Sequence, residues 1–334
     1  MSKPFRNGLV VGKFAPPHMG HQLLLETALD QCENVTVLVY SNPDFPNMPS
    51  ETRASWIREL YPSVSVFVPE NPPHNDADDF MQREFVKTFL EREKIAVDAV
   101  FTSETYGAGF AKHLQVKHVL VDLERVQIPI SGTQVRVNVH ANRAMLDPRI
   151  YRHFVQKIVF MGAESTGKST LTEALAKKYQ TNFVPEYGRE VWMQKNGVLE
   201  LQDYVHIAVH HRTLEDAAIL ESNRFLFVDT NAITTMFWCY AYEGDGLPEL
   251  TVLATDAQTR YDHVFVCNDD IPFVQDGWRD DHVWRSRQQS LILYDLTVRG
   301  VPYTQVSGSL EERVAQVETV LDAQEKENAR VSVS

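Results

Sequence analysis

Residues 157–171 read KIVFMGAESTGKSTL, and the rest of the chain can be interpreted from this stretch. Its first five residues predict a short buried strand, and the apolar spacing after Ser169 predicts a helix that runs to Tyr179. Between them, Gly162 to Ser169 matches GxxxxGK[ST], whose glycines let successive backbone N–H groups point at phosphate oxygens. Strand, loop and helix follow in the order that this motif requires. The sequence therefore predicts a nucleoside triphosphate site that begins at Gly162.

Each residue of this loop has an expected role in binding the triphosphate. Lys168 can reach the β- and γ-phosphates, and the Ser169 hydroxyl is placed to ligate Mg²⁺. The helix N-terminus adds the positive end of its dipole. We expect Lys168 to be catalytic as well, and the residues expected to bind ATP are Gly162, Glu164, Ser165, Thr166, Gly167, Lys168, Ser169 and Thr170.

The composition is that of a folded chain with an acidic charge balance. With 334 residues, of which 43% are hydrophobic, the chain is long enough for two domains with separate cores. The net charge of −13 argues against a nucleic-acid surface, so anionic substrates must be held in local basic pockets. Cys32, Cys239 and Cys267 lie far apart without CxxC spacing, which predicts neither a disulfide framework nor a zinc site.

The sequence also predicts where the protein acts. No stretch approaches the ~18 apolar residues of a membrane span, and the N-terminus has no signal-peptide core. We therefore expect a cytoplasmic protein whose partners are small molecules, and neither nucleic acid nor a membrane. Whether the chain forms a homo-oligomer is left open by the sequence.

The first half of the chain alternates short apolar runs with helical patterns. Strands are expected at 9–11, 35–40, 64–68, 97–102 and 116–121, and helices at 20–32, 51–60 and 79–93. This rhythm predicts a doubly wound parallel sheet, in which ligands bind at the carboxyl ends of the strands. Residues 71–79, with two prolines, are expected to form a loop over that site.

The first of these strand ends carries GKFAPPHMGH, residues 12–21. His18 and His21 are three residues apart at the opening of a helix, so they lie on the same side, beside its N-terminus. Their N–H groups could hold the phosphates of a triphosphate, and Lys13 could position one of them. A structural histidine pair near a turn is the alternative for HxGH taken alone. The residues expected to line the nucleotide here are Gly12, Phe14 and Gly20.

A second donor cluster follows the last strand of this half, at ISGTQVR, residues 130–136. Ser131 can cap a helix, and Arg136 follows about one turn later. The hydroxyls of Ser131 and Thr133, together with this guanidinium, suit a polyphosphate.

These motifs resemble a known family. GKFxPxHxGH with ISxTxxR resembles the adenylyltransferase domain of nucleotidyltransferases, and GxESTGKST resembles the kinase domain of NadR-type proteins. That family joins nicotinamide-mononucleotide adenylyltransferase to ribosylnicotinamide kinase. The resemblance covers roughly residues 8–320, and its specificity comes from the order of the three motifs. Some members carry an N-terminal helix-turn-helix repressor segment, which the few residues before the first loop do not imply here.

The resemblance implies a division of labour. Residues 1–153 would transfer AMP from ATP to nicotinamide mononucleotide, giving NAD and pyrophosphate. Residues 154–334 would be a phosphate-loop kinase that uses ATP and Mg²⁺ to phosphorylate nicotinamide riboside. By this resemblance His18 and His21 contact the ATP phosphates and the transition state, and Arg136 contacts the β/γ end.

Three further residues of the first half are candidates for binding the mononucleotide. Arg53 could meet its phosphate, or could be a solvated helical arginine. Trp56 could stack on nicotinamide, or could belong to the core. Glu104 lies in a TSE similar to that of the family, and could contact the nucleotide or cap the next helix.

Two carboxylates follow strands in the second half. Glu186 follows a strand expected at 181–184 and can orient or deprotonate a ribose hydroxyl, unless it is an exposed loop acid. NadR-type kinases have a similar EYxRE, which implies substrate contacts for Tyr187 and Arg189. Asp229 ends a buried strand and can bind Mg²⁺ or act as the base. The sequence does not separate these roles for Glu186 and Asp229.

The remaining features predict a lid and a terminal helix. Residues 274–287 combine a polar loop, a glycine and several arginines; we expect Arg279 and Arg285 to stabilise the transferring phosphoryl group, with solvated surface arginines as the alternative. The last helix is expected at 310–321, followed by a frayed polar end. A structural role is expected for His206, His210 and His211, which lack a completing metal ligand.

Two rival functions are compatible with these motifs. One is a nucleotide-sensing regulator that binds ATP or NAD with little turnover, and the other is a different pairing of a kinase with a nucleotidyltransferase. Retention of His18, His21, Lys168 and Ser169 favours an enzyme. A GTPase is disfavoured because the second half contains no NKxD tetrapeptide.

Overall fold

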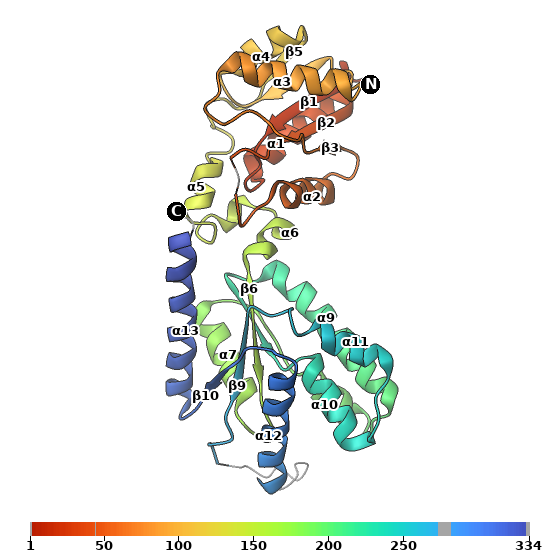
Figure 1. Ribbon diagram of the computed structural model, residues 1–334, viewed down its shortest axis with the longest axis vertical. Coiled ribbons are helices and arrows are strands. Elements are labelled where there is room, and N and C mark those ends of the chain that lie inside the picture. Colours follow the sequence, from red (N-terminus) through yellow and green to blue (C-terminus); the bar gives the residue numbers. More distant parts are fainter. Residues whose placement is uncertain (1, 44, 273–281, 332–334) are drawn as a thin grey trace. The chain divides into compact units, whose positions relative to one another are not determined.

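The computed structural model describes residues 2–43, 45–272 and 282–331. The chain divides into two compact units, unit 1 (Met1–Phe154) and unit 2 (Val155–Ser334). In each unit the described strands form a five-stranded parallel sheet that is flanked by helices (Figure 1). The doubly wound α/β fold predicted for both halves is thus confirmed.

The sheet of unit 1 has the strand order β3-β2-β1-β4-β5. Its strands are β1 (Phe5–Gly12), β2 (Cys32–Val39), β3 (Ser65–Phe67), β4 (Ala99–Thr102) and β5 (Lys117–Leu120). Its helices are α1 (Met19–Gln31), α2 (Ser50–Leu60), α3 (Asp79–Arg92), α4 (Gly107–Leu114), α5 (Gly132–Val137) and α6 (Pro148–Tyr151), with 3-10 turns η1 (Arg143–Met145) and η2 (Arg152–Phe154). The strand order reverses between β1 and β4, and such a switch point is where doubly wound sheets open a ligand crevice.

Alternation along the strands divides the side chains of unit 1 between two cores. On β1, Val10 packs with α1 and α2, whereas its neighbour Leu9 packs with α3 and α4 on the opposite face. The bounds of helix α4 were not predicted, because the two glycines in GAGFAKHL weaken a helical pattern. The helix forms because Phe110 and Ala111 are buried against the sheet.

The sheet of unit 2 has the order β10-β9-β6-β8-β7, so the switch point lies between β6 and β9. Its strands are β6 (Gln156–Met161), β7 (Phe183–Val184), β8 (Phe225–Asp229), β9 (His263–Cys267) and β10 (Thr304–Val306). Its helices are α7 (Lys168–Tyr179), α8 (Tyr187–Gln194), α9 (Leu201–Glu221), α10 (Ala232–Glu243), α11 (Pro248–Asp256), α12 (His282–Val298) and α13 (Leu310–Val331).

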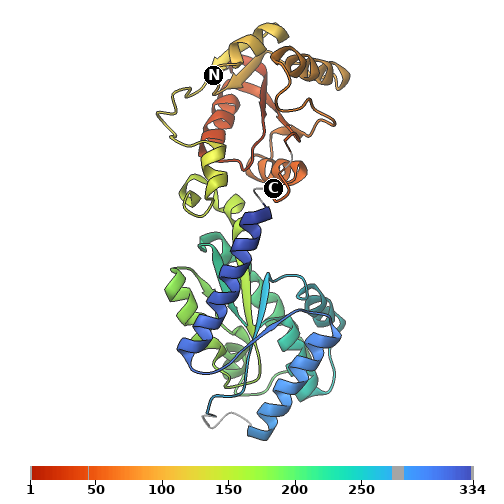
Figure 2. The same ribbon diagram turned by 60° about the vertical axis from the view of Figure 1, so that its left-hand side comes forward.

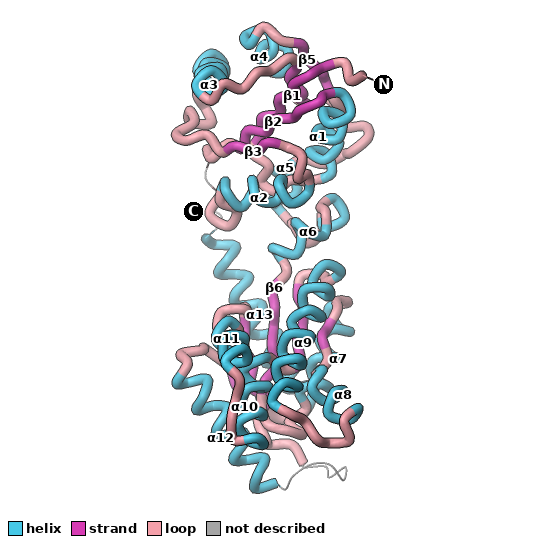
Figure 3. Tube along the Cα trace, turned by 90° about the vertical axis from the view of Figure 1, so that its right-hand side faces the viewer, coloured by secondary structure: helices cyan, strands magenta, loops and turns pink. Residues whose placement is uncertain are grey.

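Helices α7 and α13 pack together on one face of this sheet (Figures 1 and 2). Helices α9, α10 and α11 form a second cluster, joined by Tyr204, Cys239 and Leu250, and face the viewer in Figure 3. The expected end of the last helix at 321 is wrong: α13 continues to Val331, because the polar residues there are good helix formers. Strand β7 is shorter than the expected 181–184.

The turn after β6 requires glycine for two reasons. Gly162 has φ +135°, a conformation that other residues rarely adopt, and a Cβ there would lie 2.7 Å from the Cys267 carbonyl oxygen. The end of β9 therefore lies directly against the start of the phosphate loop, and a side chain at this position would force them apart.

We predict that Gly162→Ala lowers both the stability of unit 2 and its affinity for ATP, because the clash adds to the strain of a positive φ. Gly300→Ala is the matched control: Gly300 has φ +68° but nothing within 4 Å of the added Cβ, so it should cost only about 1–2 kcal/mol. Denaturant unfolding and ATP titration measure the two effects. Equal losses of stability and of ATP affinity in Gly162→Ala and Gly300→Ala would show that the clash makes no contribution.

Candidate active sites

The first candidate site lies in unit 1, where the loop after β1 leads into α1. His18 is the N-cap of α1: its Nδ1 accepts from the Gly20 N–H at 3.2 Å, and the His21 Nδ1 accepts from the His18 N–H at 3.2 Å. Because both Nδ1 atoms accept, the proton of each neutral ring is on Nε2. The two rings, with centroids 3.8 Å apart, therefore each carry an Nε2–H that can bind a ligand.

The ISGTQVR segment meets this histidine pair. A Cβ added at Gly132 would lie 3.9 Å from the His18 Nε2 and 3.2 Å from the Arg136 Nη1, so glycine separates the two groups. Arg136 also donates to the Ala15 carbonyl at 2.8 Å and to the Thr133 hydroxyl at 3.0 Å. The fold thus brings the two motifs together, although they lie at opposite ends of the sequence of unit 1.

Ser131 and Lys13 complete the polar lining of this region. The Ser131 hydroxyl accepts from the Gln134 N–H at 3.2 Å, which makes Ser131 the N-cap of α5, as expected. Lys13 donates to the side chain of Asn75, so the loop expected at 71–79 contacts the site. Burial, and then the charge of Arg136, lowers the pKa of Lys13.

The electrostatics of the histidine pair favour an anionic ligand. Burial lowers the pKa of His18 to about 4, with further lowering by Arg125 and Arg136. Burial also holds the pKa of His21 well below its usual value, helped by His18 and the same arginines. The rings are therefore neutral donors among cations. Sequence reasoning missed Arg125. Its position just after the carboxyl end of β5 could have indicated that it lies near the site.

The residues expected to line the nucleotide differ in what they offer. Phe14 is 1% exposed, and its ring lies 4.9 Å from that of His21, so it supports the histidine from the core. At Gly12 an added Cβ would meet the Phe14 ring at 3.1 Å, and at Gly20 one would meet the His18 ring at 3.1 Å. Both glycines allow these rings to pack on the backbone.

Arg53 is fully buried, so the solvated alternative is wrong. Its guanidinium donates to the Met48 carbonyl at 2.8 Å, to the Tyr40 carbonyl at 2.9 Å and to the Lys13 carbonyl. It also lies over the Phe45 ring, 5.2 Å from its centroid. Arg53 therefore fixes the main chain at the carboxyl ends of β1 and β2. Contact with a substrate phosphate stays a prediction.

Trp56 and Glu104 also make contacts within the protein. Trp56 is 2% exposed and packs against Phe154, with ring centroids 5.9 Å apart, so it belongs to a core cluster. Its stacking on nicotinamide stays a prediction. Glu104 is exposed and accepts from Arg125 at 3.0 Å. Capping of α4 by Glu104 is wrong, because the N-cap is Tyr106 and has no side-chain cap bond.

The second candidate site is the loop between β6 and α7 in unit 2. Three of its residues have positive φ: Gly162 at +135°, Ser165 at +56° and Gly167 at +81°. The Lys168 Nζ and the Thr166 hydroxyl each donate to the Ala163 carbonyl at 2.8 Å, so the loop closes on itself. The neighbouring residues at the rim are Glu164, half-buried, with Ser169 and Thr170, both exposed.

Two buried side chains that the sequence analysis missed brace this loop. Gln289 on α12 accepts from the Ala163 N–H at 2.9 Å and donates to the Cys267 carbonyl at 3.1 Å. Arg313 on α13 is 2% exposed and donates to the carbonyls of Thr166, Gly308 (3.0 Å) and Asn268 (3.1 Å). A signal for Arg313 was present, since it lies at helical spacing among apolar residues of the terminal helix.

The two arginines expected in the lid have different outcomes. Arg279 lies outside the described residues. Arg285 is 8% exposed and donates to the carbonyls of Asp269 and Ile271, each at 3.0 Å, so its description as a solvated arginine is wrong. It holds the segment that follows β9 near the phosphate loop. A direct role in phosphate binding stays a prediction.

Two carboxylates face this loop. Asp229, at the end of β8, is 1% exposed, and burial raises its pKa to about 6, with a further contribution from the charge of Glu186. Lys168 and a hydrogen bond from Ser169 act in the opposite direction. Glu186 is half-buried just before α8 and makes no side-chain cap bond. The fold therefore brings Asp229 close both to Glu186 and to the lysine of the phosphate loop.

The donor set suits a hard cation that takes most of its ligands from phosphates and water. The Asp229 Oδ1 is buried and has no hydrogen-bond partner within the described part of the chain. It lies beside the Ser169 hydroxyl, and carboxylate and hydroxyl oxygens are ligands that Mg²⁺ accepts. Among the described residues, no group of three or more His, Cys, Asp or Glu side chains could hold a metal by itself.

The expected substrate residues Tyr187 and Arg189 lie at the start of α8. The Tyr187 hydroxyl lies 3.2 Å from the His206 Nε2, and its ring lies 4.2 Å from the ring of His210. Arg189 is exposed. His211 belongs to a different environment, because it is 4% exposed and contacts the main chain of Asp229.

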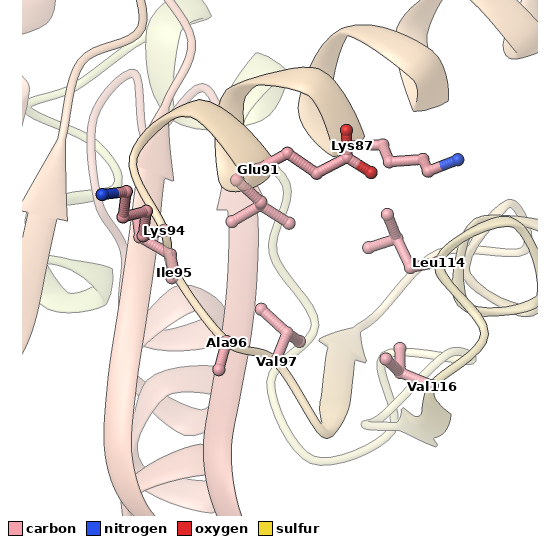
Figure 4. Close-up of a pocket in the computed structure, with 9 residues that line it drawn as sticks. Lys87, Glu91, Lys94, Ile95, Ala96, Val97, Leu114 and Val116 are labelled. Carbon is pink, nitrogen blue, oxygen red and sulfur yellow. The ribbon is translucent and has the colours of Figure 1, made fainter.

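A separate hollow of about 360 Å³ in unit 1 lies away from these residues (Figure 4). Its apolar lining includes Leu90, Val97 and Val116, and Lys87 and Glu91 stand at its edge. Val97 and Val116 precede β4 and β5, so the hollow lies at the amino ends of the strands. It is therefore at the opposite edge of the sheet from the histidine pair.

Together, these folds and sites define a chain that joins a nucleotidyltransferase-like domain to a phosphate-loop nucleotide-binding domain. Residues 9–144 match the cytidylyltransferase-like family, and residues 157–313 match an AAA domain family. The described helices include none that is long and apolar enough to cross a membrane.

The chain is similar in sequence to NadR proteins. It is 28% identical over 323 residues to the trifunctional NAD biosynthesis/regulator protein NadR of Escherichia coli (strain K12), covering 90% of this chain and 78% of that protein. NadR of Salmonella typhimurium gives the same identity and coverage. The fold resembles the crystal structure of a NadR protein in complex with NR (TM-score 0.66, 20% identity, 92% of this chain and 91% of that chain). It also resembles that of a NadR protein in complex with NAD and AMP-PNP (TM-score 0.64, 21% identity, 92% and 93%).

The lowered pKa of His18 predicts that unit 1 loses stability as the pH falls from about 6.5 to about 4. Within this range the unfolded chain binds the His18 proton and the folded chain does not, so protonation favours unfolding. Unfolding by denaturant at a series of pH values measures the slope.

His18→Gln should make this slope shallower between pH 6.5 and 4. His74→Gln is the control, since the His74 side chain is 74% exposed and should leave the slope unchanged. An unaltered slope in His18→Gln would show that burial does not disfavour the charged ring.

Proposed function

We propose that the chain is a two-site enzyme of NAD biosynthesis. Unit 2 phosphorylates nicotinamide riboside with ATP to give nicotinamide mononucleotide, and unit 1 adenylylates this product with ATP to give NAD and pyrophosphate. The observation that carries the proposal is the presence of two phosphate-binding motifs, each at a helix N-terminus at the carboxyl edge of its own parallel sheet. Homology to NadR spans both units and supports the two activities.

The comparison with NadR proteins also supports small molecules as the ligands of this chain. Solved NadR proteins of similar fold are described in complex with NR, and with NAD and AMP-PNP. Nicotinamide mononucleotide is the product of unit 2 and the substrate of unit 1, which is a chemical reason for joining the two units in one chain. The acidic net charge of −13 is compatible with these ligands because each site has cations of its own, Lys13 and Arg136 in unit 1 and Lys168 in unit 2.

In unit 1, a phosphate oxygen of the mononucleotide attacks the α-phosphorus of ATP. The bond between that phosphorus and the α–β bridging oxygen breaks, and pyrophosphate leaves with the electron pair. Because the nucleophile is already an anion, no base is needed, and catalysis depends on alignment and charge stabilisation. His18 and His21 donate to the phosphates from Nε2, Lys13 and Arg136 supply positive charge, and Ser131 and Thr133 bind the β/γ end.

In unit 2, a ribose hydroxyl attacks the γ-phosphorus of ATP, the γ–β bridging bond breaks, and ADP leaves. The phosphate-loop N–H groups and Lys168 hold the triphosphate. Asp229 receives a hydrogen bond from Ser169, so we assign it to the metal, and the more exposed Glu186 takes the hydroxyl proton. When bound by Ser169 and Asp229, Mg²⁺ supplies positive charge beside the β- and γ-phosphates.

The other expected residues have supporting roles in this scheme. Arg53 and Arg285 hold main-chain segments that border the two sites. Those proposed to contact the mononucleotide or the riboside are Trp56, Glu104, Tyr187 and Arg189.

The two activities should be separable by single substitutions. Lys168→Ala should lower formation of mononucleotide from the riboside by at least about 100-fold, because it removes a cation that stabilises the transferring group. It should spare formation of NAD from supplied mononucleotide, and His21→Ala should do the reverse. Chromatography of the products with Mg²⁺ and ATP measures both steps.

Two outcomes would count against this function. Loss of both activities in either variant would exclude independent sites. Tight binding of NAD by the unaltered protein without formation of mononucleotide or NAD would support the regulator instead.

The assignment of the two carboxylates makes a further prediction. Asp229→Asn should raise the Mg²⁺ concentration needed for half-maximal kinase activity, because it weakens a metal ligand. Glu186→Gln should lower kcat by about 10²–10⁴-fold, with little change in that Mg²⁺ concentration, because it removes the proton acceptor. Kinase rates over a Mg²⁺ series distinguish them, and the reverse pattern would exchange the two roles.

A further inference from the structure

A buried polar network lies behind Asp229 in unit 2. Glu215 on α9 is 1% exposed and accepts from the Tyr261 hydroxyl and the Arg260 Nε, each at 2.7 Å. His211, one helical turn earlier, is 4% exposed, and its Nδ1 lies 3.3 Å from the Glu215 Oε1. Its Nε2 lies 3.2 Å from the main-chain oxygen of Asp229. The network therefore ends on the backbone of a proposed metal ligand.

The register of the sheet explains why a side chain is needed there. Strand β7 pairs with β8 only as far as Val184 and Val228, one residue before Asp229. The next N–H along β8, that of Thr230, bonds to the Phe160 carbonyl of β6 at 3.0 Å. Because successive residues of a strand face opposite neighbours, the Asp229 carbonyl faces the side where β7 has ended. His211 supplies the donor that β7 lacks at this point.

The Asp229 carbonyl fixes the position of one proton in this network. The Asp229 main-chain oxygen can only accept, so the Nε2 of His211 carries a proton. Burial alone would raise the pKa of Glu215, but hydrogen bonding by His211 and the charge of Arg260 bring it to about 2. Glu215 is thus an ionised acceptor, and its Oε1 lies beside the Nδ1 of His211. The imidazole is held from both sides.

The network is anchored at a distance from the site. Arg260 also donates to the Asp216 carboxylate at 2.6 Å, and the Lys157 Nζ lies 3.9 Å from the same carboxylate. Lys157 belongs to β6, the strand that leads into the phosphate loop. The position of the imidazole is therefore tied to the central strand of unit 2.

The turn after Asp229 is buried and has a strained backbone. Thr230 has φ +69°, a conformation that costs a threonine about 1–3 kcal/mol and must be imposed by its surroundings. After Thr230 in the chain, the Asn231 Oδ1 accepts from the Ile233 N–H at 3.0 Å and caps α10. The Asp229 carboxylate, with one oxygen bonded by Ser169, lies between these restraints.

We infer that His211 is a positioning residue of the phosphotransfer site: by donating to the Asp229 carbonyl it fixes the turn that directs the Asp229 carboxylate toward Ser169. The inference rests on the proposed function only for the role of Asp229 in holding the metal of a bound nucleotide. His211 itself does not touch the substrate. Its loss should therefore act through the metal-binding step.

The test compares His211→Leu, which removes the imidazole donor, with His211→Gln, whose amide retains an N–H donor at about the reach of the imidazole Nε2. We measure how much Mg²⁺ tightens the binding of a non-hydrolysable ATP analogue, relative to binding in EDTA. His211→Leu should reduce this tightening, and the kinase kcat, by about 10–100-fold. The KM for the riboside should change little, and His211→Gln should recover most of both losses.

Ile219→Ala on the same helix is the matched control for stability. Ile219 is buried on α9, two helical turns after His211, so its truncation should lower the unfolding midpoint without changing the effect of Mg²⁺. Adenylyl transfer from supplied mononucleotide should be unchanged in all three variants. An unaltered Mg²⁺ effect in His211→Leu would overturn the inference, as would equal losses of this effect in His211→Leu and Ile219→Ala.

The analogue titration keeps this test separate from the proposed function. If the unaltered protein makes no mononucleotide, the proposed kinase reaction fails. The Mg²⁺ effect on nucleotide binding still decides whether His211 positions Asp229, because that measurement needs only a nucleotide and the metal.

Discussion

A phosphate group can be held in an acidic protein only where main-chain N–H groups and a few cations are brought together. Both units achieve this at the carboxyl edge of a parallel sheet, where strands end together and helices begin. The loop after β6 depends on Gly162 and Gly167 for its backbone shape, and the loop after β1 depends on a histidine that caps α1. Most of the other contacts around the two sites maintain these two loops.

The buried cations near the sites share one role. Arg53 in unit 1, with Arg285 and Arg313 in unit 2, all donate to main-chain carbonyls of the site loops. A tight loop whose N–H groups point at a ligand directs its carbonyls outward, and those oxygens need donors when they are buried. Arginine can serve several carbonyls at once, because its planar fork carries five N–H groups. His211 does the same for Asp229, with a single bond.

Much of the fold and the main site residues could be predicted from the sequence. The strands, the alternation of elements and the phosphate loop follow from apolar spacing and from glycine positions, which are local properties. The bounds of helix α4 were missed because its two glycines hide the pattern, and the end of α13 was placed too early because its last turns have no apolar stripe. Arg53 was predicted either to bind the substrate phosphate or to be solvated, because a polar residue type does not show whether its side chain is buried.

The sequence by itself determined that the chain has two α/β units, that each has a phosphate-binding motif, and which residue types those motifs contain. Tertiary structure was needed to show that ISGTQVR meets the histidine pair around Gly132 and that the charge of Glu186 helps to raise the pKa of Asp229. It alone also showed that Arg313, Gln289 and His211 brace the second site from separate helices. The physical reason is that a motif is set by neighbours along the chain. Burial, charge coupling and long-range hydrogen bonds depend instead on which strand ends the sheet places side by side.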